Sequence, residues 1–267
     1  MRWLDRLAAR RRDLSANGGT VGARLAAALD AVERNDYAAA LAIWGPLAQA
    51  GIARAQSNIG ACFAEGLGVE RDASLALKWL TLAAEGGDAV GQRNLAALYF
   101  RGEGVAQDYA RAAELYRQSA EAGDGPAMDM LSWMLLEGEV MPSDPAEARR
   151  WALAAAERGV AAAMTRLGMI YHNALGVGRD PAAAAIWWQK AAVLGDADGQ
   201  AMLGAACFLG AGVPRDGVKA LGWLLRGRAG GSRLADPFMV QAHAALAPGE
   251  IAAAERFAAA PLPGAAP

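Results

Sequence analysis

A strict internal period of 36 residues is the feature that most limits how this chain can fold. Glycines recur at this interval without an insertion, at Gly51, Gly87, Gly123, Gly159, Gly195 and Gly231. Other series, of leucine, alanine, aspartate and tryptophan, keep the same phase. Periods of about 20–50 residues are typical of arrays in which each repeat buries its apolar surface against its neighbours. The chain is therefore predicted to be a repeat array that spans 51–230.

Each repeat is predicted to contain two antiparallel helices. The first carries apolar residues at i, i+1 and i+4, as in Leu95, Ala96 and Tyr99, and ends at a glycine such as Gly102. An aspartate is then expected to cap the second helix, because its carboxylate can accept the free N–H groups of the first turn. The predicted caps are Asp72, Asp108, Asp144, Asp180 and Asp216. A tryptophan or leucine seven residues later, as in Trp187, is expected on the buried face of the second helix.

The period also sets the predicted boundaries. The repeats are expected at 51–86, 87–122, 123–158, 159–194 and 195–230. An N-terminal capping helix pair is expected at 19–50 and C-terminal capping helices at 231–259, and Trp44 in the first of these caps stands one step late relative to the tryptophan series. Residues 1–18 form a basic N-terminal segment, and 260–267 are predicted to be a disordered tail. The third repeat departs most, because Val140 and Met141 replace Gly and Val before Pro142, and a local kink is expected there.

Composition and residue counts exclude several classes of protein. A net charge of −2 argues against attraction of the whole chain to nucleic acid, and no run of about 20 apolar residues predicts a transmembrane helix. Two cysteines, Cys62 and Cys207, cannot form a disulfide framework or a paired-cysteine zinc site. His172 and His243 are the only histidines, so no catalytic residue, metal site or cofactor is predicted. The N-terminus lacks the uncharged core of a secretory signal, and a cytoplasmic location is expected.

The motif within each repeat resembles that of the Sel-one-like repeat (SLR) family, related to the tetratricopeptide repeats. The fourth repeat carries it as Leu167-Gly168, Tyr171, Gly176-Val177, Asp180, Ala184, Trp187 and Ala191-Ala192. The resemblance implies an all-α fold, a right-handed superhelical α-solenoid of antiparallel helix pairs, with about five full repeats and terminal caps. It also implies a non-enzymatic adaptor or scaffold in protein complexes, with bacterial members associated with signalling, envelope regulation and host interaction.

The first helices are expected to line a concave, partner-binding groove. By analogy with tetratricopeptide repeats, the residues that face it should stand 3, 6, 10, 13 and 14 positions after each leading glycine. The candidate groove residues are Arg93, Phe100, Arg101, Trp133, Leu136, Met169, His172, Asn173 and Phe208. Such a mixture of aromatic or thioether side chains with a few charges suits a peptide groove. The alternative is that curvature buries these side chains against the next repeat.

Three functional hypotheses follow from these patterns. The first is a scaffold that binds a protein or peptide partner, of unknown identity, in the concave groove. The second is a regulator that contacts an anionic membrane surface through the basic N-terminal helix, where Trp3, Leu4 and Leu7 lie near one face beside several arginines. The plainer interpretation of that helix is that it packs on the open edge of the first repeat. The third hypothesis, an enzyme, has no supporting group of residues.

Overall fold

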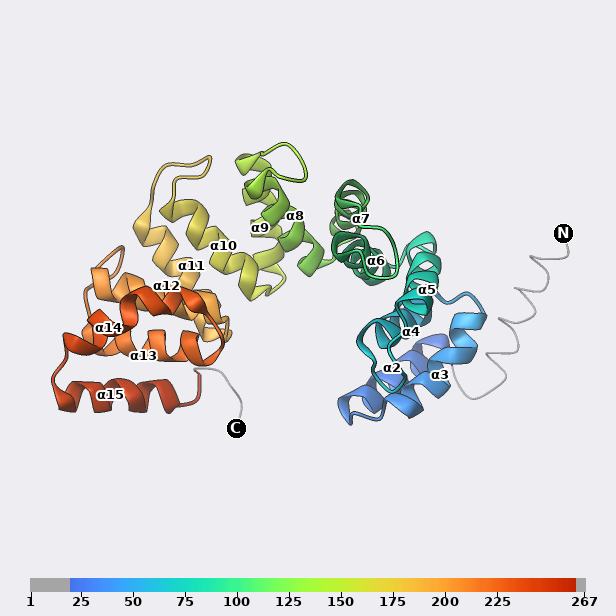
Figure 1. Ribbon diagram of the computed structural model, residues 1–267, viewed down its shortest axis with the longest axis horizontal. Coiled ribbons are helices and arrows are strands. Elements are labelled where there is room, and N and C mark those ends of the chain that lie inside the picture. The colour runs from blue at the N-terminus through green and yellow to red at the C-terminus, as the bar shows by residue number, and fades with distance from the viewer. Residues whose placement is uncertain (1–19, 263–267) are drawn as a thin grey trace, which may run out of the picture. The chain divides into compact units, whose positions relative to one another are not determined.

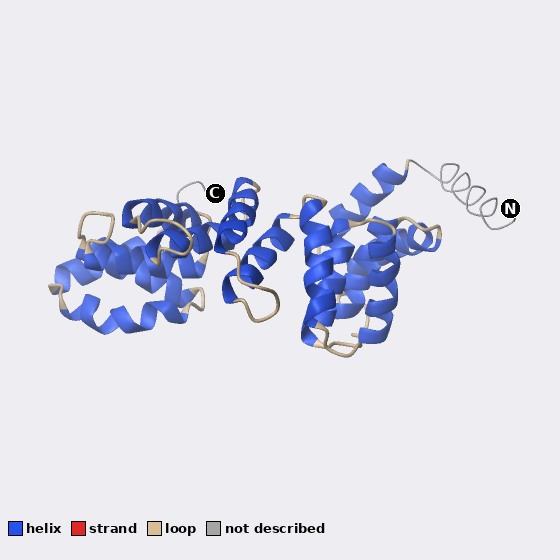
Figure 2. Ribbon diagram, turned by 90° about the horizontal axis from the view of Figure 1, so that it is seen from above, coloured by secondary structure: helices blue, strands red, loops and turns tan. Residues whose placement is uncertain are grey.

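All regular structure in the described part of the chain is helical. The structure is a computed structural model that describes residues 20–262, so the predicted basic segment at 1–18 lies outside it. Figure 2 shows helices and loops alone in this range, which confirms the all-α fold. The elements are α2 (Val21–Glu33), α3 (Tyr37–Gln49), α4 (Ala53–Glu65), α5 (Ala73–Glu85), α6 (Ala89–Arg101), α7 (Tyr109–Glu121), α8 (Gly125–Glu137), α9 (Pro145–Glu157), α10 (Ala161–His172), α11 (Pro181–Val193), α12 (Ala197–Leu209), α13 (Gly217–Ala229), η1 (Arg233–Ala235), α14 (Asp236–Ala244) and α15 (Pro248–Ala259).

These helices belong to two compact units, which the sequence did not predict. Unit 1 extends to Ala127 and unit 2 begins at Met128, so the division falls inside α8, in the third repeat. In unit 1, α4 packs on α5 and α6 on α7, and α5 contacts α6. In unit 2, α10 packs on α11 and α12 on α13, and α11 contacts α12 (Figure 1). Within each unit the chain is a stack of helix pairs, as the 36-residue period predicts.

An aspartate fixes the start of the second helix in each of the five repeats. The Oδ1 atoms of the five aspartates accept hydrogen bonds from the amides three residues on, at 2.9–3.0 Å. The amide of each aspartate also donates to a carbonyl near the end of the preceding helix, as Asp72 does to Phe63 at 2.9 Å. For Asp216, the amide of Lys219 is the largest influence and lowers the pKa of the carboxyl. Stability from this cap is therefore present at neutral pH and is lost as the pH falls through that lowered pKa.

The connector between the two helices needs left-handed backbone. In the first, second and fifth repeats two glycines adopt positive φ, as Gly66 (74°) and Gly68 (70°) do. In the fourth repeat Ala174 takes the first of these positions with φ of 57°, a conformation that costs an L-residue about 1–2 kcal/mol. In the third repeat Gly138 is left-handed, and Val140 replaces the second glycine. The amide of Asp144 nevertheless donates to the carbonyl of Leu135 at 3.1 Å. The unusual connector thus closes as the others do.

A small residue on the first helix lets a large side chain of the second helix pack against its backbone. A Cβ atom at Gly168 would lie 2.1 Å from Nε1 of Trp188, and one at Gly60 would lie 2.6 Å from Cγ of Leu80. Trp188 is only 1% exposed, and its indole nitrogen donates to the carbonyl of Thr165 at 3.3 Å. At these two positions close helix packing therefore requires glycine.

The tryptophan series proved only partly buried. Trp79, Trp151 and Trp187 are half-buried, while Trp223 is buried, and the ammonium of Lys190 lies 4.1 Å from the ring centroid of Trp187. The fully buried position is the next residue along the helix, which holds Trp188 in the fourth repeat. The predicted buried position was therefore wrong by one residue in these three repeats. Trp44, one step late in the cap, stands at this same position and is buried.

The last capping helix ends at Ala259, but ordered contacts continue into the segment predicted to be a disordered tail. The guanidinium of Arg226 lies over the rings of Trp223 and Phe257, at 5.6 and 5.4 Å from their centroids. It donates to the carbonyls of Phe257, at 2.6 Å, and of Ala260. Leu262 then packs against the buried cluster around Trp188 and Trp223. The predicted disordered tail at 260–267 is therefore wrong for its first three residues, and 263–267 lie outside the described residues.

Adjacent tryptophans allow the packing rule to be tested. Trp188→Ala should lower the free energy of unfolding by about 3–5 kcal/mol, because it leaves a cavity against Gly168. Trp187→Ala, the matched control, should cost only about 1 kcal/mol, because its ring is half-buried. Urea denaturation followed by circular dichroism measures both, and equal losses would contradict the assignment.

The strained connector gives a second test. Ala174→Gly should raise the free energy of unfolding by about 0.5–1 kcal/mol, because relief of the left-handed alanine exceeds the added chain entropy of glycine. Gly66→Ala, the reverse change at the same connector position, should lower it by a similar amount. Thermal denaturation of both variants is the measurement, and a loss of stability in Ala174→Gly would be the contrary result.

Candidate functional site

The cysteines and His172 are held in packed surroundings. Cys62 and Cys207 are buried free thiols. Burial raises the pKa of Cys62 to about 11, and burial followed by the charge of Asp216 raises the pKa of Cys207. The ring of His172 lies 5.4 Å from that of Trp188, and its Nδ1 atom is buried without a hydrogen-bond partner among the described residues. None of these side chains is placed as an activated nucleophile or base.

Residues 20–262 contain neither a group of metal ligands nor a membrane-spanning helix. No group of three or more His, Cys, Asp or Glu side chains there could hold a metal ion. In the same range, each helix is too short or too polar to cross a membrane.

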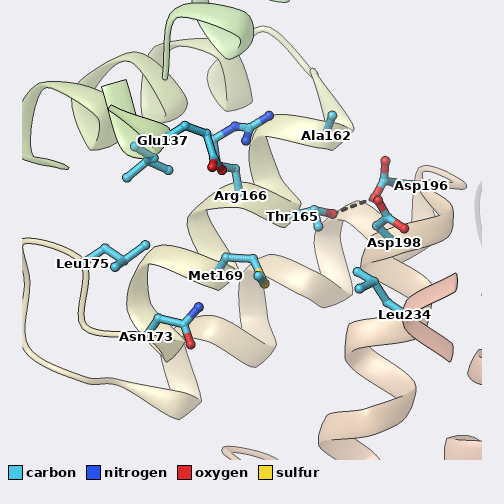
Figure 3. Close-up of a pocket in the computed structure, with 11 residues that line it drawn as sticks. Glu137, Ala162, Thr165, Arg166, Met169, Asn173, Leu175, Asp196, Asp198 and Leu234 are labelled. Carbon is cyan, nitrogen blue, oxygen red and sulfur yellow. Dashed lines mark hydrogen bonds between the residues drawn. The ribbon is translucent and has the colours of Figure 1, made fainter. Parts of the chain in front are cut away.

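The candidate site is a pocket of about 380 Å³ in unit 2, which we call the unit-2 pocket (Figure 3). Three successive first helices, α8, α10 and α12, supply most of its wall, and η1 adds Leu234. The lining residues are Leu136, Glu137, Ala162, Thr165, Arg166, Met169, Asn173, Leu175, Asp196, Asp198 and Leu234. Its volume falls within the range of about 300–1,000 Å³ that is typical of ligand pockets.

Polar contacts between repeats fix the shape of the unit-2 pocket. Asp196 caps α12, since its Oδ1 atom accepts from the amide of Gly199 at 2.7 Å. The same oxygen accepts from the hydroxyl of Thr165 on α10, also at 2.7 Å (Figure 3). Arg166 forms a paired contact with Asp129 on α8, Nε to Oδ1 at 2.9 Å and Nη2 to Oδ2 at 3.2 Å. Both contacts join neighbouring first helices, so the polar wall is held before any ligand arrives.

The structure brings three of the candidate groove residues together in this pocket. They are Leu136, Met169 and Asn173, which come from the ends of α8 and α10 and from the middle of α10. Most other lining residues also stand 3, 6, 10, 13 or 14 positions after a leading glycine. Among them is Asp198, which the same spacing rule could have identified. Arg166 stands seven positions after Gly159, a spacing that the rule does not include.

The remaining candidates in unit 2 lie elsewhere. The ring of Phe208 packs edge-on to that of Phe238, with centroids 6.4 Å apart, and contacts two buried clusters. His172 packs against Trp188, and its carbonyl accepts from Nε of Arg179 at 3.2 Å. Trp133 is half-buried on α8. For Phe208 and His172, packing within the fold accounts for the contacts observed.

The candidates in unit 1 are engaged in contacts within that unit. Arg93 donates from Nη1 to both carboxylate oxygens of Asp124, at 3.1 and 2.9 Å. Phe100 packs edge-on to Tyr109 at 5.1 Å, and Arg101 pairs with Glu103 at 3.0 Å. A smaller pocket of about 140 Å³ between α4 and α6 includes Arg101. This pocket has less than half the volume of the unit-2 pocket.

Comparisons with known proteins agree with the architecture. The Sel1 repeat family model matches residues 53–88, 89–124, 125–160, 161–196 and 197–232, each two residues later than the predicted boundaries. The crystal structure of a Sel1 repeat protein from Oxalobacter formigenes is 30% identical with a TM-score of 0.66, covering 78% of this chain and 86% of the other. A protein described as a sel1 repeat protein from Klebsiella pneumoniae subsp. pneumoniae has 23% identity and a TM-score of 0.51, covering 75% and 97%. No curated protein matches this chain.

The raised pKa of the Cys62 thiol predicts that it reacts slowly with thiol reagents. At pH 8 a thiol with a pKa of about 11 has about a hundredfold less thiolate than one at the ordinary value of 9.0. Native Cys62→Ser and wild-type proteins should therefore react with Ellman's reagent equally slowly, and the wild type should react fully in urea. Rapid modification of native Cys62 at pH 8 would contradict its burial.

Proposed function

Because the chain belongs to the Sel1 repeat family, we propose that it is a non-enzymatic scaffold that binds a segment of a partner protein in the unit-2 pocket. Sel1 repeat proteins are generally protein-interaction scaffolds, bind protein partners and are typically non-catalytic. The single observation that carries the proposal is the open volume between three successive first helices of unit 2.

The lining of the unit-2 pocket suits a polypeptide. Met169 offers a flexible apolar contact that can adjust to different side chains, and Leu136 adds a branched one. Asn173 is exposed at the rim and can both donate and accept hydrogen bonds to a peptide backbone. Apolar contacts with a few placed polar groups are what recognition of an extended segment requires.

The proposed cellular role and location rest on the sequence. Roles in bacterial signalling or envelope regulation rest on the family resemblance. The membrane-surface alternative depends on residues 1–18, which lie outside the described residues, and the cytoplasmic location stays a prediction.

Charged substitutions on the pocket wall test this proposal. Leu136→Lys together with Met169→Lys should abolish binding of the partner, since each places an unpaired charge where an apolar group would pack. Partners are first identified by affinity purification and mass spectrometry from the source organism, and their binding to each variant is then measured with purified proteins.

The control is Ile186→Lys, which puts the same charge on a second helix. Ile186 is 55% exposed on α11, so the substitution should leave both partner binding and helicity unchanged. Circular dichroism checks that all variants fold. Undiminished binding by the folded Leu136→Lys/Met169→Lys protein would refute the proposal.

A further inference from the structure

We infer, building on the proposed function, that the unit-2 pocket selects a partner segment that presents an arginine or lysine side chain next to an apolar residue. The inference rests on the sign and availability of the charges around the pocket. The lining contains three carboxylates, those of Glu137, Asp196 and Asp198, and one cation, Arg166.

The charge of Arg166 is already compensated from outside the pocket. Its guanidinium is held by both oxygens of Asp129, which is 7% exposed and is not a lining residue. No comparable cation faces the three carboxylates of the lining, because Arg166 is its only basic residue. A ligand therefore meets a negative surface, even though an arginine stands in the wall.

The carboxylates also keep acceptor capacity. Asp198 uses Oδ1 to accept from the hydroxyl of Ser232 at 2.5 Å, and Asp196 uses Oδ1 for its two bonds. Within residues 20–262, their Oδ2 atoms make no hydrogen bond, and the exposed Glu137 makes none. A guanidinium carries five N–H donors and an ammonium three, so either can satisfy more than one of these oxygens.

Helix ends reinforce the negative potential. Glu137 is the last residue of α8 and Asn173 is the C-cap of α10, so the negative ends of two helix dipoles border the pocket. The positive end of α12 also lies there, but Asp196 at its cap and Asp198 in its first turn outweigh it, because a helix end carries only about half a charge. A neutral or acidic side chain would gain nothing from this field.

An apolar surface lies beside the carboxylates. Met169 and Leu175 line the pocket, and Leu234 of η1 is 41% exposed at its edge (Figure 3). The aliphatic stem of an arginine or lysine packs on such a surface while its charged end reaches the carboxylates. The remaining apolar area then favours a leucine-like residue next to the basic one in the partner sequence.

A peptide selection measures this preference directly. The full-length protein is used to select binders from a random peptide library displayed on phage, and the affinities of synthetic versions are measured by fluorescence anisotropy. Arginine and lysine next to an apolar residue should be enriched over the starting library. Binding of these peptides should weaken about tenfold in Glu137→Gln/Asp198→Asn, and should also weaken with added salt.

The control variant removes the same charge elsewhere. Glu157→Gln/Glu255→Gln changes two exposed carboxylates, on α9 and α15, that do not line the pocket, and should bind like the wild type. Asp198→Asn retains an oxygen that can accept from Ser232, and Asp196 is left intact because it caps α12. Circular dichroism of each variant confirms folding.

The outcomes separate this inference from the function on which it rests. Peptides that require Leu136 and Met169 but show no basic enrichment, or that bind Glu137→Gln/Asp198→Asn as tightly as wild type, would overturn the inference alone. Selected peptides that still bind Leu136→Lys/Met169→Lys, or a selection without binders, would overturn both. Self-association that disappears in Glu137→Gln/Asp198→Asn would assign the pocket to a second copy of the chain and overturn a foreign partner segment.

Discussion

The close approach of two helices at a small residue is the contact on which each helix pair depends. At Gly168 and Gly204 there is no room for a Cβ atom, because Trp188 and Leu224 fill the space against the backbone. Close packing of this kind maximises dispersion contacts and excludes water from the pair. It also fixes the axial position of one helix relative to the other, since a large side chain fits only opposite the small residue. The spacing between these two positions therefore cannot change without loss of the contact.

The connector preserves that spacing by hydrogen bonds at both ends. In every repeat the aspartate side chain caps the second helix while its backbone amide returns to the end of the first. An inserted residue would move the aspartate away from one of these partners and leave polar backbone groups unsatisfied. The third repeat shows which part of the connector is flexible in sequence: Val140 and Met141 replace the second glycine and the valine, yet Asp144 keeps both bonds. Within the connector, the constraint that maintains the period is thus the aspartate and not the second glycine.

Packing within each helix pair leaves one face of the first helix available for contacts with neighbouring repeats or with a ligand. Part of it joins neighbouring repeats: Arg54 pairs with Asp88 at 2.6 Å in unit 1, and Thr165 donates to Asp196 in unit 2. In both cases the acceptor is the N-cap aspartate of the next first helix. One carboxylate thereby stabilises the helix start and links two repeats. The surface that remains open in unit 2 is bordered by the link between Thr165 and Asp196. Its shape therefore depends on a contact that also holds neighbouring repeats together.

Periodicity predicts what repeats in this molecule, and fails where a property depends on residues that do not repeat. Helix pairs, caps and positions near the pocket follow from spacing alone, because each is set by contacts found in every repeat. The buried face of the second helix was placed one residue early, since Trp187 and Trp188 are adjacent and hydropathy does not distinguish them; only the space above Gly168 does. The charge of the unit-2 pocket was not predictable either, because the charge of Arg166 is cancelled by Asp129 of the preceding repeat, while Asp198 comes from the next. Since no single repeat contains the proposed site, its charge arises from differences between neighbouring repeats, and the repeat motif alone does not determine it.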